Sequence, residues 1–97
     1  MKLRGSYFLE EPSDVKNDSV SLTLLTEPSK GESGGYEYVL HLATMEFIRD
    51  FMEKTNKSFY AGFNEPLMII RSLDPETIDL VINEILPQID KIARRIE

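Results

Sequence analysis

The first half of the chain alternates apolar and polar residues in three places, and each place predicts a short β-strand. Residues 6–9 form the first strand, and Pro12 limits it because proline has no N–H to donate to a strand ladder. Residues 20–24 and 36–42 alternate with a period of two, and the later run predicts one covered face and one largely wet face. Glycines and a proline in residues 26–35 suit a flexible connection. The pattern predicts a meander of three antiparallel strands.

An amphipathic helix is predicted directly after the third strand. Thr44 can cap its N-terminus by accepting a hydrogen bond from an N–H of the first turn. The apolar stripe of this helix contains Met45, Ile48, Phe51 and Met52. We expect the helix to end near residues 56–58. Residues 67–70, Leu-Met-Ile-Ile, are apolar on both faces and predict a strand in the centre of the sheet.

A second helix is predicted from Asp74 onward, with a capping carboxylate followed by a proline at the first helical position. It carries a seam of isoleucines: Ile78, Ile82, Ile85, Ile89, Ile92 and Ile96. Pro87 lies inside this run and is expected to bend the helix near Asn83. The spacing also suits a coiled-coil face. Because a small sheet needs a cover, we predict that the seam packs in the core of the same chain.

Together these elements predict one α+β domain over residues 1–97. The expected fold is a small, mainly antiparallel sheet of about four strands, in the order β-β-β-α-β-α, covered on one face by two helices. The length suits a single core. A content of 41% hydrophobic and 29% charged residues is typical of a globular protein.

Charge is distributed unevenly along the chain, which has a formal net charge of −6. Residues 1–53 contain 10 acids and 5 bases, whereas residues 54–97 contain 7 acids and 6 bases. An acidic chain is not expected to bind nucleic acid, because phosphate recognition requires a basic surface. Six acids fall in or beside the N-terminal loops: Glu10, Glu11, Asp14, Asp18, Glu27 and Glu32. They form either a solvated face that maintains solubility or a contact surface for a basic partner.

The residue types needed for common catalytic and metal sites are scarce. The chain has no cysteine, and His41, expected on the exposed sheet face, is its only histidine. The chain therefore lacks the residues needed for a histidine-dependent triad, a thiol nucleophile or a zinc site of the usual composition. We predict no metal, no cofactor and no enzymatic activity. An enzyme using paired carboxylates remains an alternative. The acids, however, show neither a short Asp-x-Asp spacing nor a nearby glycine-rich phosphate loop.

The absence of cysteine also favours a reducing compartment, so we expect a cytoplasmic location. Residues 1–5 have no apolar run behind them, and no stretch approaches the roughly 18 apolar residues that a membrane span needs. Neither an export signal nor a membrane partner is expected.

Residues 59–63 are rich in aromatic side chains for a connecting segment. Such rings either anchor a partner or close the protein's own core. We take Tyr60 and Phe63 as candidate anchors for a partner.

Two stretches resemble a known family. Residues 35–48, Gly-Tyr-Glu-Tyr-Val-Leu-His-Leu-Ala-Thr-Met-Glu-Phe-Ile, and residues 67–78, Leu-Met-Ile-Ile-Arg-Ser-Leu-Asp-Pro-Glu-Thr-Ile, precede a final helix. This pattern, over about the last two-thirds of the chain, resembles the eighth family of immunity proteins from bacterial polymorphic-toxin and contact-dependent inhibition systems. Members carry a Trp-Leu pair at the start of the first helix, where this chain has residues 46–48, Glu-Phe-Ile.

The resemblance implies a cytoplasmic protein that binds the C-terminal toxin domain of its own system and blocks it, without catalysis or a cofactor. It assigns no individual toxin-contacting residues. Many such toxins are nucleases with basic clefts, toward which an acidic partner would be steered. We therefore assign the partner surface to Glu10, Glu11, Asp14, Asp18, Glu27, Glu32, Tyr60 and Phe63. The main alternative is a structural or regulatory module that self-associates as a homodimer, through the last helix or an exposed edge strand.

Overall fold

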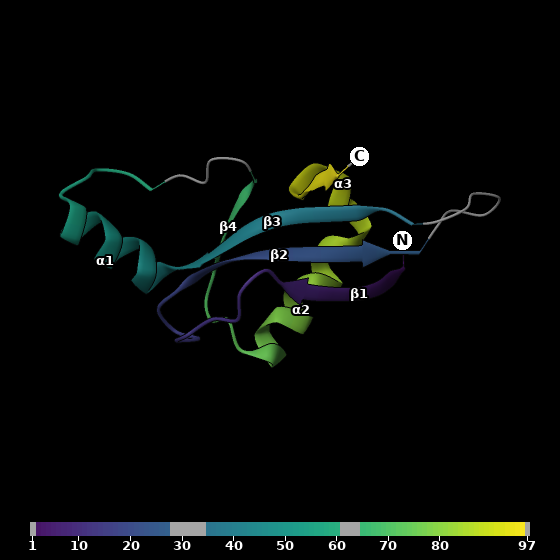
Figure 1. The fold of residues 1–97 in the computed structure, drawn as a ribbon, viewed down its shortest axis with the longest axis horizontal. Coiled ribbons are helices and arrows are strands. Elements are labelled where there is room, and N and C mark those ends of the chain that lie inside the picture. Colours follow the sequence, from purple (N-terminus) through teal and green to yellow (C-terminus); the bar gives the residue numbers. More distant parts are fainter. Residues whose placement is uncertain (1, 28–34, 61–64, 97) are drawn as a thin grey trace.

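The computed structural model describes residues 2–27, 35–60 and 65–96, and its centre is an antiparallel meander (Figure 1). The three strands of the meander are β1 (Leu3–Phe8), β2 (Ser19–Thr26) and β3 (Glu37–Thr44). Both β1–β2 and β2–β3 pair antiparallel, and Leu22 of β2 lies between Phe8 and Leu40. The predicted meander is confirmed, but the face of β3 that was expected to be wet is not: Val39 is 8% exposed and His41 is half-buried.

Two further strands share the second edge of β3. Strand β4 (Leu67–Ile70) runs parallel to residues 41–44 of β3, and β5 (Arg94–Ile96) runs antiparallel to residues 37–39. The sheet order β1-β2-β3-β4 places β4 at an edge, so the prediction of a central strand was wrong. Four apolar residues in a row do not distinguish a strand buried on both faces from an edge strand with one exposed apolar side chain, here Ile69.

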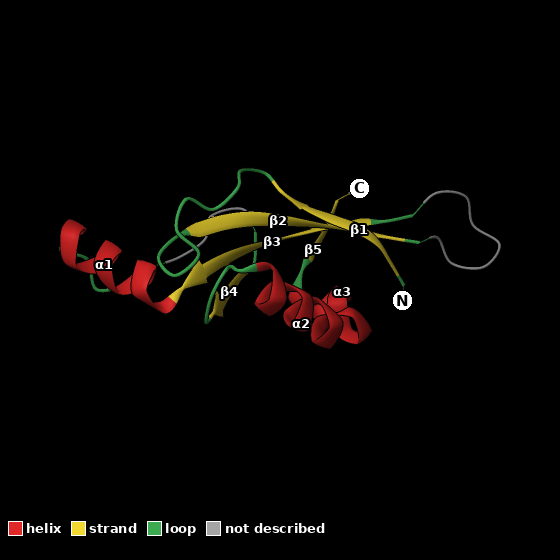
Figure 2. Cartoon of the chain, turned by 90° about the horizontal axis from the view of Figure 1, so that it is seen from below, coloured by secondary structure: helices red, strands yellow, loops and turns green. Residues whose placement is uncertain are grey.

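One face of the sheet is covered by the C-terminal helices (Figure 2). These are α2 (Pro75–Ile85), the 3-10 turn η1 (Leu86–Gln88) and α3 (Ile89–Ile92). The core lies between them and the leucines of β2 and β3. Its most deeply buried aliphatic side chains include Leu22, Leu24, Leu40, Leu42, Leu73, Ile82 and Ile89.

The isoleucine seam is therefore core up to Ile89, as predicted, but it does not lie on one helix. Pro87 has no N–H to continue the helical ladder, and α2 ends at Ile85 instead of bending near Asn83. Ile96 belongs to β5 and is 40% exposed. The periodicity alone did not reveal this change from helix to strand.

Helix α1 (Met45–Thr55) projects from the sheet, beyond the ends of β2 and β3 (Figures 1 and 2). Thr44 caps it as predicted, since the Phe47 N–H donates to Thr44 Oγ1 at 3.2 Å. Thr44 is also the last residue of β3, so no loop turns the helix back over the sheet, and no α1 residue is fully buried. The α+β fold is confirmed, with α2, η1 and α3 as its main covering layer. No helix in the described ranges is both long and apolar enough to cross a membrane.

Candidate functional site

Four of the predicted acids lie in one segment, residues 9–18, which joins β1 to β2 and which we call the acidic connection. Glu10, Glu11 and Asp14 are exposed, and Asp18 is half-buried. Leu9, at the start of the segment, leaves 77% of its surface exposed. An exposed apolar residue therefore directly precedes two exposed acids in the sequence.

Asp18 holds the acidic connection in shape. Its Oδ2 accepts hydrogen bonds from the Ser13 N–H at 2.8 Å and from Ser13 Oγ at 3.2 Å, and its Oδ1 accepts from the Ser19 N–H at 2.8 Å. Burial would raise the pKa of this carboxyl, but these hydrogen bonds together favour the charged form and lower the pKa below its ordinary value. Asp18 is therefore a structural acid whose oxygens are already engaged.

Asp14 shapes the middle of the segment through a side-chain turn. Its Oδ1 accepts from the Lys16 N–H at 2.9 Å, and its backbone carbonyl accepts from the Asn17 N–H at 3.1 Å. Asn17 Nδ2 in turn donates to Oδ2 of Asp50 at 2.7 Å, which ties the segment to α1.

The segment is also tied to the opposite edge of the molecule. The Val15 carbonyl accepts from the Leu73 N–H at 2.7 Å and from Ser72 Oγ at 3.3 Å. Ser72 and Leu73 lie between β4 and α2. With contacts at both ends and in the middle, the acidic connection is preorganised although it contains no helix or strand.

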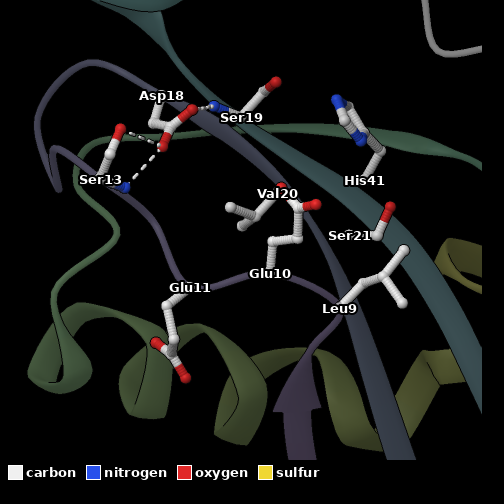
Figure 3. Close-up of a pocket in the computed structure, with 9 residues that line it drawn as sticks. All are labelled: Leu9, Glu10, Glu11, Ser13, Asp18, Ser19, Val20, Ser21 and His41. Carbon is white, nitrogen blue, oxygen red and sulfur yellow. Dashed lines mark hydrogen bonds between the residues drawn. The ribbon is translucent and has the colours of Figure 1, made fainter.

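The acidic connection lines a shallow hollow of about 350 Å³ that also includes Val20 and His41 (Figure 3). The carboxylates of Glu10, Glu11 and Asp18 point in different directions, and that of Glu11 is turned away from Asp18. A catalytic carboxylate pair places its two groups on either side of one reacting bond, and the carboxylates of this hollow do not face one another across a common space. Within the described residues, no group of three histidines or acids is placed to hold a metal ion.

A second hollow, of about 440 Å³, lies between the acidic connection and α1. Its lining residues are Asp14, Asn17, Phe47, Asp50, Phe51, Lys54 and Thr55. Asp50 was not among the sequence candidates, because it lies on a helix and only the Asn17 contact brings it to the loop. Leu9 was also missed. Its position at the end of a strand, directly before two acids and Pro12, was the available signal.

The remaining candidates lie elsewhere. Glu27 follows β2 at the opposite end of that strand, where its N–H donates to the Lys2 carbonyl at 2.9 Å and its carboxylate lies 3.9 Å from Lys2 Nζ. The length of β2 therefore separates Glu27 from the acidic connection. Glu32 and Phe63 lie outside the described residues.

Tyr60 is half-buried in an aromatic cluster of this chain. Its hydroxyl lies 2.7 Å from His41 Nε2, and its ring meets Phe47 and Phe51 edge-on with centroids 5.7 and 5.2 Å away. These contacts hold the segment after α1 against the helix and β3. Phe59, by contrast, leaves 64% of its surface exposed.

No protein-family model, curated protein or solved structure matches this chain. The chemistry of the acidic connection therefore carries the functional argument.

Proposed function

We propose that this protein is a non-catalytic immunity protein of the bacterial cytoplasm. It binds the toxin domain of its own system and blocks the active or substrate-binding surface of that domain. The observation that supports this proposal is that the acids of the acidic connection have two different roles. Asp14 and Asp18 shape the segment, and Glu10 and Glu11 are displayed on it.

The displayed acids are available to a partner. Among the described residues, no hydrogen bond or ion pair engages the carboxylate of Glu10 or Glu11. Carboxylates on two neighbouring residues attract a basic surface over a range of about 10 Å at ordinary ionic strength, which accelerates encounter. A toxin that binds a polyanionic substrate presents such a basic surface.

The rigidity of the segment supports affinity. Ordering a flexible loop on binding costs free energy, and a loop that is already held by hydrogen bonds avoids most of that cost. Leu9 supplies apolar surface beside the acids, so that one edge of the contact excludes water while the carboxylates set its orientation.

The charged part of this contact is tested by reversal. In the double variant Glu10→Lys with Glu11→Lys, we expect association with the toxin domain to slow by about tenfold at low ionic strength, and its salt dependence to flatten. The matched control is Asp79→Lys with Glu84→Lys, which makes the same change of net charge at two exposed positions of α2. Surface plasmon resonance at several salt concentrations measures both. Equal slowing in both variants would show that only total charge matters and would contradict the assignment.

The immunity role itself is tested in cells. We expect a large secreted protein with a variable C-terminal domain to be encoded immediately upstream, and that domain is the probe, expressed in bacteria with and without this chain. We expect growth arrest by the domain alone and restored growth when the wild-type chain is present. Continued arrest, with both proteins detected by immunoblot, would overturn the proposal.

A further inference from the structure

Within the described residues the sheet has three outer strand edges, and they are protected to different degrees. In β1 the register shifts between Leu3 and Gly5, and such an irregularity hinders the addition of another strand. Strand β5 is only three residues long and contains Arg94 and Arg95, charged residues of the kind that protect an edge. The four residues of β4 are all apolar and paired without a bulge, so β4 is the least protected edge.

Apolar surface continues from this edge onto α2. Ile69 is 58% exposed and Leu80 is 62% exposed. Both line a hollow of about 300 Å³ that also includes Val81. Exposed apolar side chains beside an open strand edge are characteristic of a surface that another strand covers.

The backbone of β4 shows which of its groups are open. The His41 N–H donates to the Pro66 carbonyl at 2.8 Å, so the peptide groups of residue 66 face β3. Peptide groups alternate along a strand, and those of Leu67 and Ile69 therefore point away from β3. The missing N–H of Pro66 lies on the β3 side and leaves no gap in the outer edge.

We propose that a second copy of this chain pairs with β4 in antiparallel orientation, about a two-fold axis at Met68. In this register Leu67 forms a hydrogen-bonded pair with Ile69 of the second copy, and Ile69 with Leu67. The inference goes beyond the proposed function and does not depend on it.

The charges of Glu65 and Arg71 favour this register over one centred on Ile69. Beyond the ends of β4, at the bends of residues 65 and 71, this register brings Glu65 toward Arg71 of the second copy, and Arg71 toward Glu65. Pairing Ile69 with itself would instead place Arg71 opposite the apolar Leu67. Neither Glu65 nor Arg71 forms an ion pair with any described residue of its own chain. The two-fold axis therefore yields two ion pairs at the rim of an apolar centre.

Such a dimer leaves the proposed toxin-binding residues available. Strands β1 and β4 lie at opposite edges of the order β1-β2-β3-β4, and Glu10 and Glu11 follow β1. A dimer would thus carry two acidic connections, in each of which Glu10 and Glu11 lie on the β1 side while Val15 contacts Ser72 and Leu73, just after β4.

Cysteine cross-linking tests the register directly, because the chain has no cysteine of its own. At the axis, residue 68 faces residue 68 of the second copy in a non-hydrogen-bonded pair, with Cβ atoms about 4.5–5.5 Å apart, within reach of a disulfide after slight adjustment. We expect Met68→Cys to form covalent dimers under mild oxidation, at least about tenfold faster than Ile69→Cys, whose partner is residue 67. Equal or absent cross-linking of both variants would overturn the register.

Sedimentation velocity tests the dimer itself and does not require a change in the core. We expect wild-type dimers, monomers for Ile69→Lys, and dimers for the control Tyr7→Lys on the β1 edge, where Tyr7 is 51% exposed. Arg71→Glu should raise the dimer dissociation constant by about tenfold, and adding Glu65→Arg should restore it. Monomeric wild-type protein at about 100 μM, or no rescue by the double reversal, would overturn the proposal.

Discussion

Carboxylates have different roles in the acidic connection, and their hydrogen bonds distinguish these roles. Asp18 accepts three hydrogen bonds from Ser13 and Ser19, whereas Glu10 and Glu11 have none from described residues. The N–H and hydroxyl groups around Asp18 donate hydrogen bonds to its carboxylate, and the negative charge strengthens these bonds. A charge reversal at Asp18 would therefore distort the segment, and the same reversal at Glu10 would alter only its surface.

Tyr38 illustrates a buried polar group whose titration is tied to folding. Its side chain is 1% exposed and its hydroxyl donates to Asp90 Oδ1 at 2.7 Å. Burial, together with this hydrogen bond and the Asp90 charge, raises the pKa of the phenol from 10.0 to about 12. The folded state therefore holds the Tyr38 proton more tightly than the unfolded state does.

This shift predicts a loss of stability in alkaline solution. Tyr38 contributes fully below pH 10, and its contribution is lost as the pH rises from 10 toward 12. Tyr38→Phe should cost about 1 kcal/mol at neutral pH through the lost hydrogen bond and should show a smaller alkaline decline. Urea unfolding between pH 8 and pH 11 measures both effects, with the exposed Tyr7→Phe as control. An identical alkaline decline in all three proteins would contradict the assignment to Tyr38.

At the scale of elements, local capping signals determined where the helices start. Thr44 and Asp74 each accept a hydrogen bond from an N–H three residues later, as predicted. These contacts depend only on residues within one turn, so they can be inferred from sequence. The ends of elements are harder to infer, because Pro87 and the pairing of β5 with β3 together determine how the isoleucine run is divided.

The cap of α2 predicts a pH-dependent helix start. The nearby Ser72 hydroxyl, together with hydrogen bonds from the N–H and hydroxyl of Thr77, lowers the pKa of Asp74 from 3.8 to about 2. A lowered pKa means that the stabilisation is present above pH 4 and is lost as the pH falls toward 2. Asp74→Ala should lower the thermal midpoint by roughly 5 °C at pH 7 and by much less at pH 2. Differential scanning calorimetry measures these thermal midpoints, with Asp79→Ala as control. A difference between the wild type and Asp74→Ala that is as large at pH 2 as at pH 7 would contradict the prediction.

At the scale of the whole molecule, burial is concentrated between the sheet and the C-terminal helices. Ile82 of α2 is 2% exposed, whereas α1 has no fully buried residue. The molecule is elongated, with extents of 51 × 25 × 21 Å, and α1 lies at one end of it (Figure 1). The two amphipathic helices, similar in sequence pattern, thus contribute unequally to the core.

Truncation of one isoleucine on each helix should reveal this inequality. Ile82→Ala removes a side chain from the core and is expected to cost about 3–4 kcal/mol, with Ile48→Ala of α1 costing about 1 kcal/mol. Chemical denaturation of both variants measures the difference. Equal losses would place α1 in the main core and contradict the arrangement in Figures 1 and 2.

The sequence by itself determined the three-strand meander, the two helix starts, the α+β class and the acidic character of the segment after β1. Each of these depends on neighbours within a few residues: the period of two in residues 36–42, the caps Thr44 and Asp74, and the run from Glu10 to Asp18. Steric and hydrogen-bonding preferences at that range act before distant parts of the chain meet.

Only the tertiary structure decided what depends on distant contacts. Val15 and Leu73 meet across 58 residues of sequence and help to fix the acidic connection, and His41 meets Tyr60 and draws it into an aromatic cluster. The edge position of β4, the projection of α1 and the separation of Glu27 from Glu10 follow from the way the sheet is ordered. Burial and hydrogen-bond satisfaction are optimised over the whole molecule, so which acids shape the loop and which are displayed was settled only by folding.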